Sequence, residues 1–250
     1  MITNLWLIGI GTGSESHVTL EGRQALREAA TILLPLKGED KDDLAKLRQR
    51  IIASSGTNAQ VLTFEYPVRD LALPYLARVN AWHDEIARRW QLALDAAGVH
   101  GPTALLVWGD PALYDSTIRI AQRLSPAPRL RVIPGITAVQ ALTAAHAIPL
   151  NTVNGPVTIT TGRRLRDEGW PEGAETLVVL LDGETSFTHL DLADLYIWWG
   201  AYLGSPEQIL IEGPAAEVSQ QIIESRAAAR TQHGWIMDSY LLRRVGMAGE

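Results

Sequence analysis

Cysteine is absent from this 250-residue sequence, and its absence excludes several kinds of chemistry. Without thiols the chain forms no disulfides, holds no cysteine-ligated zinc or iron–sulfur cluster, and has no thiol nucleophile. The six histidines include no pair spaced as H-x-x-x-H and no H-E-x-x-H motif. Because such spacings place two histidines on one metal ion, we expect no metal site.

Long apolar runs and a surplus of positive charge are missing as well. The internal run at residues 177–181 is strand-sized, whereas a transmembrane helix needs about 20 apolar residues. Residues 1–4 carry no basic group of the kind that begins a secretion signal, so we expect a soluble, cytoplasmic protein. Twenty-eight acidic residues against 22 lysines and arginines give a net charge of -6. Proteins that grip nucleic acid usually carry the opposite balance, so neither nucleic acid nor membrane is an expected partner.

Apolar runs of strand length alternate with helical patterns along the chain. Continuously apolar strands separated by helices predict parallel sheets that are covered on both faces. The first five runs are residues 5–10, 32–36, 61–64, 104–108 and 130–133. After a link at residues 148–151 come runs at 157–161, 177–181 and 209–211, while 197–199 form either a strand or a buried aromatic plug. The sequence therefore predicts an α/β protein with two α/β domains of mostly parallel sheets, residues 1–150 and 151–250.

Three glycine-containing turns follow predicted strands, at residues 9–13, 109–111 and 134–137. In an open parallel sheet the ligand binds beyond the carboxyl ends of the strands, and glycine lets it approach the backbone. The first turn does not complete the dinucleotide fingerprint G-x-G-x-x-G in either register, because Ser14 and Ser16 stand at the third glycine position. A tight strand-to-helix turn and a ligand contact remain equally open for it.

Several polar residues near these turns have both a structural and a functional interpretation. Asp110 could form an Asx turn or receive a hydroxyl or amine of a ligand, and Tyr114 could pack on that ligand or cover a helix start. Arg163 and Arg164 follow a strand, where arginine forks would bind an anionic substrate, although neighbouring acids also suit a solvated helix start. We favour the interpretation in which these arginines bind an anionic substrate. His83, on a long amphipathic helix, is expected to be a partly exposed surface residue.

The order of the turn motifs resembles that of the tetrapyrrole methylases. The motifs are G-x-G-x-G at residues 9–13, G-D-P-x-x-Y at 109–114 and P-G-[IV]-[ST] at 134–137. Four longer stretches, residues 106–117, 159–165, 199–204 and 233–238, are similar to a deacetylating subgroup of that family. Members of that subgroup methylate C-1 of precorrin-5 and release acetate to give precorrin-6A. The resemblance extends from residue 5 to about residue 244.

The resemblance implies two α/β domains with S-adenosylmethionine (SAM) folded in the cleft between them, a tetrapyrrole substrate and a homodimer. The cofactor contacts that it implies are Trp108, Gly109, Asp110, Leu113, Thr137, Ala138 and, from the second domain, Leu181. Gly11 and Thr12 are implied to lie near the tetrapyrrole, whose many carboxylates make Arg163 and Arg164 the expected anchors. The family has no phosphate to bind in the first turn, which agrees with the incomplete fingerprint.

The first turn departs from the family pattern in a way that affects mechanism. Thr12 stands where many relatives have proline and Ser14 where many have aspartate, so the usual acid is absent. Methyl transfer needs alignment and exclusion of water, whereas acetate release also needs an acid, base or oxyanion donor at the acetyl group. The candidates for that second step are Asp110 and Tyr114, followed by Asp182 and His233.

Other functions remain open at this point. Another SAM-dependent tetrapyrrole methylase would share the same motifs. An NAD-linked oxidoreductase would need the complete glycine fingerprint and an acid after the second strand, where Glu39 is available. An RNA methyltransferase is disfavoured by the acidic balance, and a ligand sensor without catalytic activity also fits the sequence.

Overall fold

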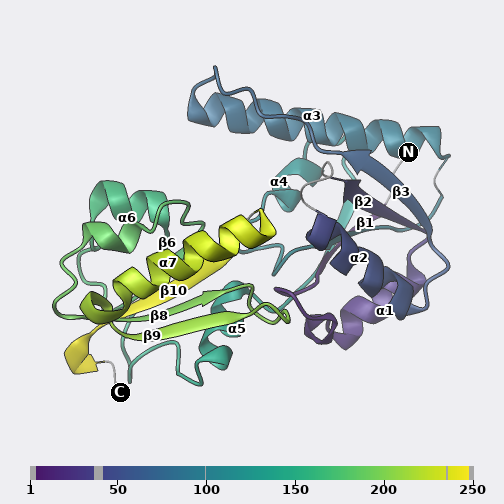
Figure 1. Ribbon diagram of the computed structural model, residues 1–250. Helices are drawn as coiled ribbons and strands as arrows, with labels where there is room; N and C mark the ends of the chain where they lie inside the picture. Colours follow the sequence, from purple (N-terminus) through teal and green to yellow (C-terminus); the bar gives the residue numbers. More distant parts are fainter. Residues whose placement is uncertain (1–3, 37–41, 99, 235, 248–250) are drawn as a thin grey trace. The chain divides into compact units, whose positions relative to one another are not determined.

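The computed structural model describes residues 4–36, 42–98, 100–234 and 236–247 (Figure 1). Glu39, the acid considered for an NAD-linked enzyme, and Trp235, in the stretch at 233–238, lie outside these residues. The chain divides into two compact units, Met1–Thr137 and Ala138–Glu250. In the described ranges, no helix combines the length and apolar character needed to cross a membrane.

The first unit is built on a parallel sheet of five strands, as the sequence predicted. The strand order is β3-β2-β4-β1-β5, and every neighbouring pair is parallel. All five residues of β4 are buried, as expected for a central strand with both faces covered. The strands are β1 (Asn4–Gly9), β2 (Thr31–Leu36), β3 (Gln60–Glu65), β4 (Thr103–Val107) and β5 (Arg129–Ile133).

Helices cover both faces of this sheet (Figure 1). Alternate residues of β1 serve the two faces: Leu5 and Leu7 join one apolar cluster, and Ile8 joins the other. The first cluster lies under α3 (Tyr75–Ala96) and α4 (Thr117–Ala121), and the second under α1 (Leu20–Glu28) and α2 (Asp42–Ser55). A short 3-10 helix, η1 (Glu15–His17), connects β1 to α1.

His83 is buried, so the expectation of a partly exposed surface residue was wrong. Its exposed fraction is 3%, and it shares the inner stripe of α3 with Ile86, Trp90 and Leu94. Positions three, seven and eleven residues apart fall on one face of a helix, and here that face meets the sheet. Burial and the positive charges of Arg123, Arg119 and Arg69 lower the pKa of His83.

The second unit contains a mixed sheet in the order β6-β7-β10-β8-β9. Among its described strands, only β6 and β7 pair in parallel, while β10 runs antiparallel to both β7 and β8, and β8 antiparallel to β9. The prediction of mostly parallel sheets is therefore wrong for this unit. The strands are β6 (Val157–Thr161), β7 (Thr176–Leu180), β8 (Leu195–Ala201), β9 (Ile209–Pro214) and β10 (Asp238–Arg244).

β10 was not predicted, because an aspartate and two arginines interrupt its apolar pattern. Yet Arg243 is 1% exposed at the centre of the sheet. Its guanidinium donates to the hydroxyl of Thr176 at 3.0 Å and to the carbonyl of Pro149, which gives its buried N–H groups hydrogen-bond partners. Residues 197–199 form part of β8, which decides between the two interpretations of that segment in favour of a strand.

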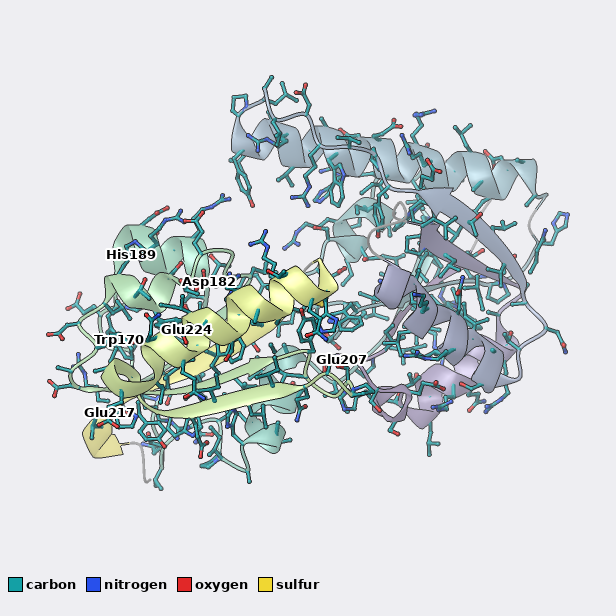
Figure 2. All side chains as sticks on the ribbon, viewed as in Figure 1. Trp170, Asp182, His189, Glu207, Glu217 and Glu224 are labelled. Carbon is teal, nitrogen blue, oxygen red and sulfur yellow. The ribbon has the colours of Figure 1, made fainter. Side chains whose placement is uncertain are left out.

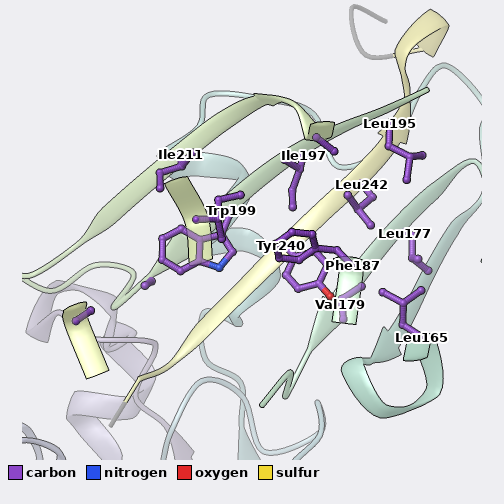
Figure 3. Packing of buried hydrophobic residues seen from close by; sticks show 14 of the residues in the cluster. Leu165, Leu177, Val179, Phe187, Leu195, Ile197, Trp199, Ile211, Tyr240 and Leu242 are labelled. Carbon is purple, nitrogen blue, oxygen red and sulfur yellow. The ribbon is translucent and has the colours of Figure 1, made fainter. Parts of the chain in front are cut away.

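One face of the mixed sheet packs against α7 (Ala215–His233) and η3 (Ser186–His189), and Figure 3 shows buried side chains of this cluster. Trp199, Phe187 and Tyr240 form its centre, and the rings of the last two meet edge to face with centroids 5.3 Å apart. The outer side of α7 carries exposed acids, among them Glu217 and Glu224 (Figure 2). α6 (Gly162–Glu168) follows β6, and η4 (Val245–Met247) follows β10.

The opposite face is covered by α5 (Ala138–Ala145), which explains where the first unit ends. α5 contacts β8 and β10, and a Cβ atom on Gly200 of β8 would lie 2.9 Å from the Leu142 side chain. Just after α5, the Nε2 atom of His146 lies 3.0 Å from the Trp199 carbonyl. Since these contacts tie α5 to the second sheet, the compact units divide after Thr137 rather than near residue 150.

Candidate functional site

The three glycine turns of the first unit meet at the carboxyl ends of β1, β4 and β5, which are neighbours in the sheet. A Cβ atom on Gly9 would lie 2.5 Å from the amide nitrogen of Gly135 and 2.9 Å from the carbonyl oxygen of Gly109. Gly11 and Gly109 exchange two backbone hydrogen bonds, of 3.2 and 2.8 Å. Glycine is required here because three backbones approach too closely for a side chain. We call Gly9, Gly109 and Gly135 the glycine junction.

Asp110 connects two of these turns through its carboxylate. Oδ1 accepts the amide N–H of Ala112 at 2.7 Å, which is the Asx turn considered from the sequence. Oδ2 accepts the amide N–H of Gly135 at 2.9 Å. The carboxylate therefore fixes the G-D-P turn against the P-G turn, and each oxygen keeps a second lone pair for another donor.

The predicted cofactor residues of the first unit lie in these two connected loops. Trp108, Leu113 and Thr137 are partly buried, and Gly109 is buried in the glycine junction. Tyr114, at the end of the G-D-P loop, is 46% exposed and has a φ of 50°. An aromatic residue in the left-handed region costs about 1–3 kcal/mol and is found mostly where a ligand or switch needs it.

His17, in the first turn, was not among the site residues predicted from the sequence. Gly11 has a φ of 75°, and a Cβ atom there would overlap the side chain of His17. Thr12 is 4% exposed, and both its amide nitrogen and its Oγ1 lie 3.4 Å from Nδ1 of His17. Burial lowers the pKa of His17. The only signal in the sequence was its position, five residues after Thr12 in the same loop.

In the second unit, Leu181 follows β7 in a strained and exposed conformation. Its φ is 53° and its exposed fraction is 68%, although the strand before it is buried. Figure 2 labels Asp182, the next residue. Its exposed fraction is 5%. An apolar side chain held in the left-handed region at a strand end is typical of a ligand contact, which is the role that the family resemblance implies for Leu181.

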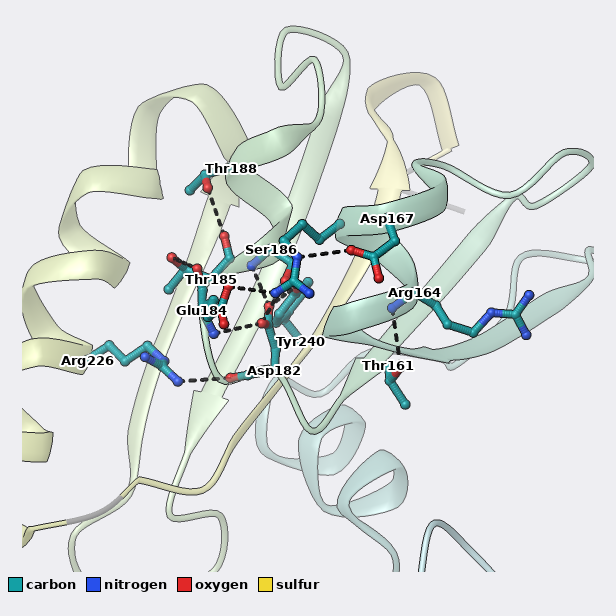
Figure 4. Close-up of polar contacts among 11 residues, drawn as sticks. Thr161, Arg164, Asp167, Asp182, Glu184, Thr185, Ser186, Thr188, Arg226 and Tyr240 are labelled. Carbon is teal, nitrogen blue, oxygen red and sulfur yellow. Dashed lines mark hydrogen bonds and ion pairs between the residues drawn. The ribbon is translucent and has the colours of Figure 1, made fainter. Parts of the chain in front are cut away.

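Asp182 holds this turn through four hydrogen bonds (Figure 4). Oδ1 accepts the amide of Glu184 at 3.0 Å and the hydroxyl of Ser186 at 2.8 Å. Oδ2 accepts the amide of Ser186 and the hydroxyl of Tyr240, both at 2.6 Å. We call this carboxylate with its four donors the Asp182 anchor. Four donors occupy the lone pairs of both oxygens, so the carboxylate is committed to the fold and not to the acetyl group.

Burial and the nearby Asp182 carboxylate raise the pKa of Tyr240, so its hydroxyl remains a neutral donor. Arg226 of α7 extends the network by donating to the carbonyl of Asp182 at 2.8 Å. The same guanidinium and the indole N–H of Trp199 each donate to Oδ2 of Asp238 at 3.0 Å. Burial raises the pKa of Asp238, an effect that Arg226 opposes.

The predicted substrate anchors lie at the start of α6. Thr161 caps this helix by accepting the amide of Arg164 at 3.4 Å. The Arg164 side chain is 68% exposed and forms an ion pair of 2.7 Å with Glu168, so its charge is shared with a neighbouring acid. Arg163 is exposed. This arrangement agrees with the interpretation of Arg164 as part of a solvated helix start, and the role of both arginines as substrate anchors stays a prediction.

His233, the last candidate for acetate release, is partly buried against the Tyr202 ring.

Comparisons with known proteins agree with this architecture. Residues 4–219 match the family model described as Tetrapyrrole (Corrin/Porphyrin) Methylases. A precorrin-6A synthase (deacetylating) from Sinorhizobium sp is 46% identical over 246 residues, which cover 95% of this chain and 94% of that protein.

Solved structures show the same fold. A protein related to cobalamin synthesis (CobF) from Corynebacterium diphtheriae is 37% identical with a TM-score of 0.80, covering 98% of this chain and 100% of that one. A uroporphyrin-III C-methyltransferase from Thermus thermophilus, solved with S-adenosyl homocysteine, is 18% identical with a TM-score of 0.62, covering 97% and 98%. The chain belongs to the tetrapyrrole (corrin/porphyrin) methylases.

Proposed function

We propose that this chain is a SAM-dependent C-methyltransferase of cobalamin biosynthesis, which methylates C-1 of precorrin-5 and releases acetate to give precorrin-6A. The observation that carries the proposal is the 46% identity to a deacetylating precorrin-6A synthase over nearly the full length of both chains. The geometry supports it, because the turns that bear the family motifs form one connected structure at the carboxyl ends of neighbouring strands.

The residues present fit SAM better than a dinucleotide. The glycine junction is filled by its own backbones, and Gly11 and Gly109 bond to each other, so the first turn offers no open phosphate cradle. The Asp110 carboxylate keeps lone pairs for a ribose hydroxyl or an ammonium group. Tyr114 and Leu181 present exposed apolar surface from strained positions. Gly109, Asp110, Leu113, Thr137, Ala138 and Leu181 would hold the cofactor, together with Trp108.

The bound cofactor supplies an electrophilic methyl group, so the chain itself needs no covalent chemistry for the transfer. Its residues orient the two reactants and exclude water from the path between them. Asp110 fixes the loop that would carry the cofactor, and Gly11 and Thr12 would lie against the macrocycle. Arg163 and Arg164 would bind its carboxylates. Tyr114 would contact the reacting groups through its exposed ring.

The proposal is tested by incubating the purified protein with SAM and precorrin-5. We expect S-adenosylhomocysteine and acetate in equal amounts and a tetrapyrrole with the mass of precorrin-6A. Methyl transfer to uroporphyrinogen III but not to precorrin-5 would identify a different tetrapyrrole methylase. A thermal shift with NAD and none with S-adenosylhomocysteine would instead favour an oxidoreductase. The homodimer and the cytoplasmic location stay predictions, and light scattering in solution tests the first.

A further inference from the structure

Acetate release needs a group that stabilises charge on the acetyl oxygen, and the structure narrows the choice. Asp182 is occupied by four internal donors, and both oxygens of Asp110 accept backbone N–H groups. Neither carboxylate can donate a hydrogen bond while it is ionised. Tyr114 and His233 stay candidates from the sequence, and the first turn contains a further donor.

His17 is held firmly at the carboxyl end of β1, where parallel sheets bind their ligands. Ser14 caps η1 by accepting the amide of Ser16 at 3.1 Å. Glu15 is tied to α1 through its carbonyl, which accepts from Arg23 at 2.7 Å, and to α2 through its carboxylate, which accepts from Ser54 at 2.8 Å. The imidazole therefore sits on a short helix whose start is held to α1 and α2, and its Cβ fills the space beside Gly11.

The contacts of Nδ1 determine where the proton of the ring resides. The amide N–H of Thr12 points at Nδ1, so this nitrogen accepts and carries no proton. The hydroxyl of Thr12 lies at the same distance and can donate to the same atom. Burial lowers the pKa of His17, which favours the neutral ring at pH 7. A neutral imidazole with a bare Nδ1 has its proton on Nε2.

The Nε2–H group is available to a ligand. His17 is only partly buried, and among the described residues the hydrogen bonds of its ring are confined to Nδ1. A neutral donor of fixed orientation suits an oxygen on which negative charge develops, because it needs no reorganisation during the reaction.

We propose that His17 is a catalytic residue for acetate release, donating from Nε2–H to the acetyl carbonyl oxygen of the tetrapyrrole. This role rests on the proposed function. Water forms a bond to the acetyl carbon and loses a proton to solvent, while the carbonyl electron pair moves onto the oxygen that faces His17. As that pair returns, the bond between the acetyl carbon and the macrocycle breaks. Its electron pair goes to the macrocycle carbon, which takes up a proton, and acetic acid leaves and ionises.

Two substitutions separate this donor from the structural role of the ring. In His17→Asn the side-chain oxygen replaces Nδ1 as acceptor for Thr12, but the distal donor is lost. In His17→Gln the amide N–H₂ replaces the distal donor. His100→Asn is the matched control, because His100 is an exposed histidine of the same unit. For each variant we measure S-adenosylhomocysteine affinity by calorimetry, methyl transfer from labelled SAM, and acetate release with precorrin-5.

We expect His17→Asn to bind S-adenosylhomocysteine as the wild type does and to release acetate about 100-fold more slowly, the usual cost of an oxyanion donor. His17→Gln should recover part of the rate, and His100→Asn should lose none. Acetate release at the wild-type rate in His17→Asn would overturn the proposal. A parallel loss of cofactor binding, methyl transfer and acetate release would also overturn it, since the ring would then only support the loop.

Failure of the wild-type protein to act on precorrin-5 would overturn the proposed function, and this role with it. A second measurement tests His17 without any substrate. Nitrogen NMR of ¹⁵N-histidine-labelled protein, assigned with His17→Asn, should show the Nε2–H tautomer at pH 7. The Nδ1–H tautomer would exclude the proposed donor whatever the substrate is.

Discussion

Replacing Tyr240 by phenylalanine tests whether the Asp182 anchor stabilises the second unit. The change removes one donor, the hydroxyl 2.6 Å from Oδ2 of Asp182, and leaves the ring that packs on Phe187. A hydrogen bond to a buried charged group contributes about 1.5–3 kcal/mol. Since Asp182 is 5% exposed, water cannot easily replace the lost donor. We expect the local free energy of opening to fall by that amount.

Amide hydrogen exchange of residues 176–186 and 238–244 measures this change in the second unit alone. A loss of about 1.5–3 kcal/mol corresponds to exchange that is roughly ten- to 150-fold faster. Tyr196→Phe is the matched control, because Tyr196 lies on the same sheet and no hydrogen bond of its hydroxyl is found among the described residues. Equal protection in the two variants would refute the reasoning, since the hydroxyl of Tyr240 would then contribute nothing to the anchor.

Three further predictions concern the first unit. Asp110→Asn places an N–H₂ group against the amide of Gly135, so S-adenosylhomocysteine affinity should fall about tenfold in calorimetry; unchanged affinity would exclude the loop connection. Gly135→Ala should destabilise the fold by an overpacking cost of about 1–3 kcal/mol and so lower the thermal midpoint, because the added Cβ would overlap Gly9 and Gly109; an unchanged midpoint would contradict the close packing of the glycine junction. Hydrogen bonds from Arg88 and Arg89 lower the pKa of Glu85 to about 2. A carboxylate whose pKa is lowered by folding stabilises the folded state at pH values above its unfolded pKa. In urea unfolding, the extra stability of the wild type over Glu85→Gln should therefore vanish as the pH falls from 4.5 towards 2; a pH-independent difference would contradict it.

The parallel sheet of the first unit was predictable because the local amino-acid composition of each strand indicates it. Strands buried on both faces must be apolar throughout, and the glycine turns mark their carboxyl ends. The second sheet was less predictable because its central strand, β10, carries Arg243. Its hydrogen-bond partners in the interior, Thr176 and Pro149, are far away in sequence, so no local sequence pattern predicts that Arg243 is buried. The antiparallel pairing of β10 with β7 and β8 likewise joins strands that are far apart in sequence.

The candidate site shows a similar division. The positions of Gly109, Asp110 and Tyr114 could be inferred from motifs, but the second partner of Asp110, the amide of Gly135, depends on β5 lying beside β1. His83 was misplaced because a histidine next to Trp82 looks like a surface residue until the buried stripe of α3 is known. Asp182 could be picked out as a candidate, yet only the fold shows that four donors already surround it.

The polar groups of the first turn include an uncharged Ser14 and the imidazole of His17. Ser14 occupies the position where the family resemblance implies an aspartate, and here its hydroxyl caps η1. A serine cap needs no charge, so the start of η1 is capped without a carboxylate at this position. The three residues that follow bring His17 back onto Thr12, which orients the imidazole with its Nδ1 towards the protein. Substituting aspartate for Ser14 would keep the cap but place a negative charge near the oxygen that we assign to His17. Since like charges there would oppose the developing oxyanion, an uncharged cap and a neutral imidazole are a consistent pair for a step in which acetate leaves.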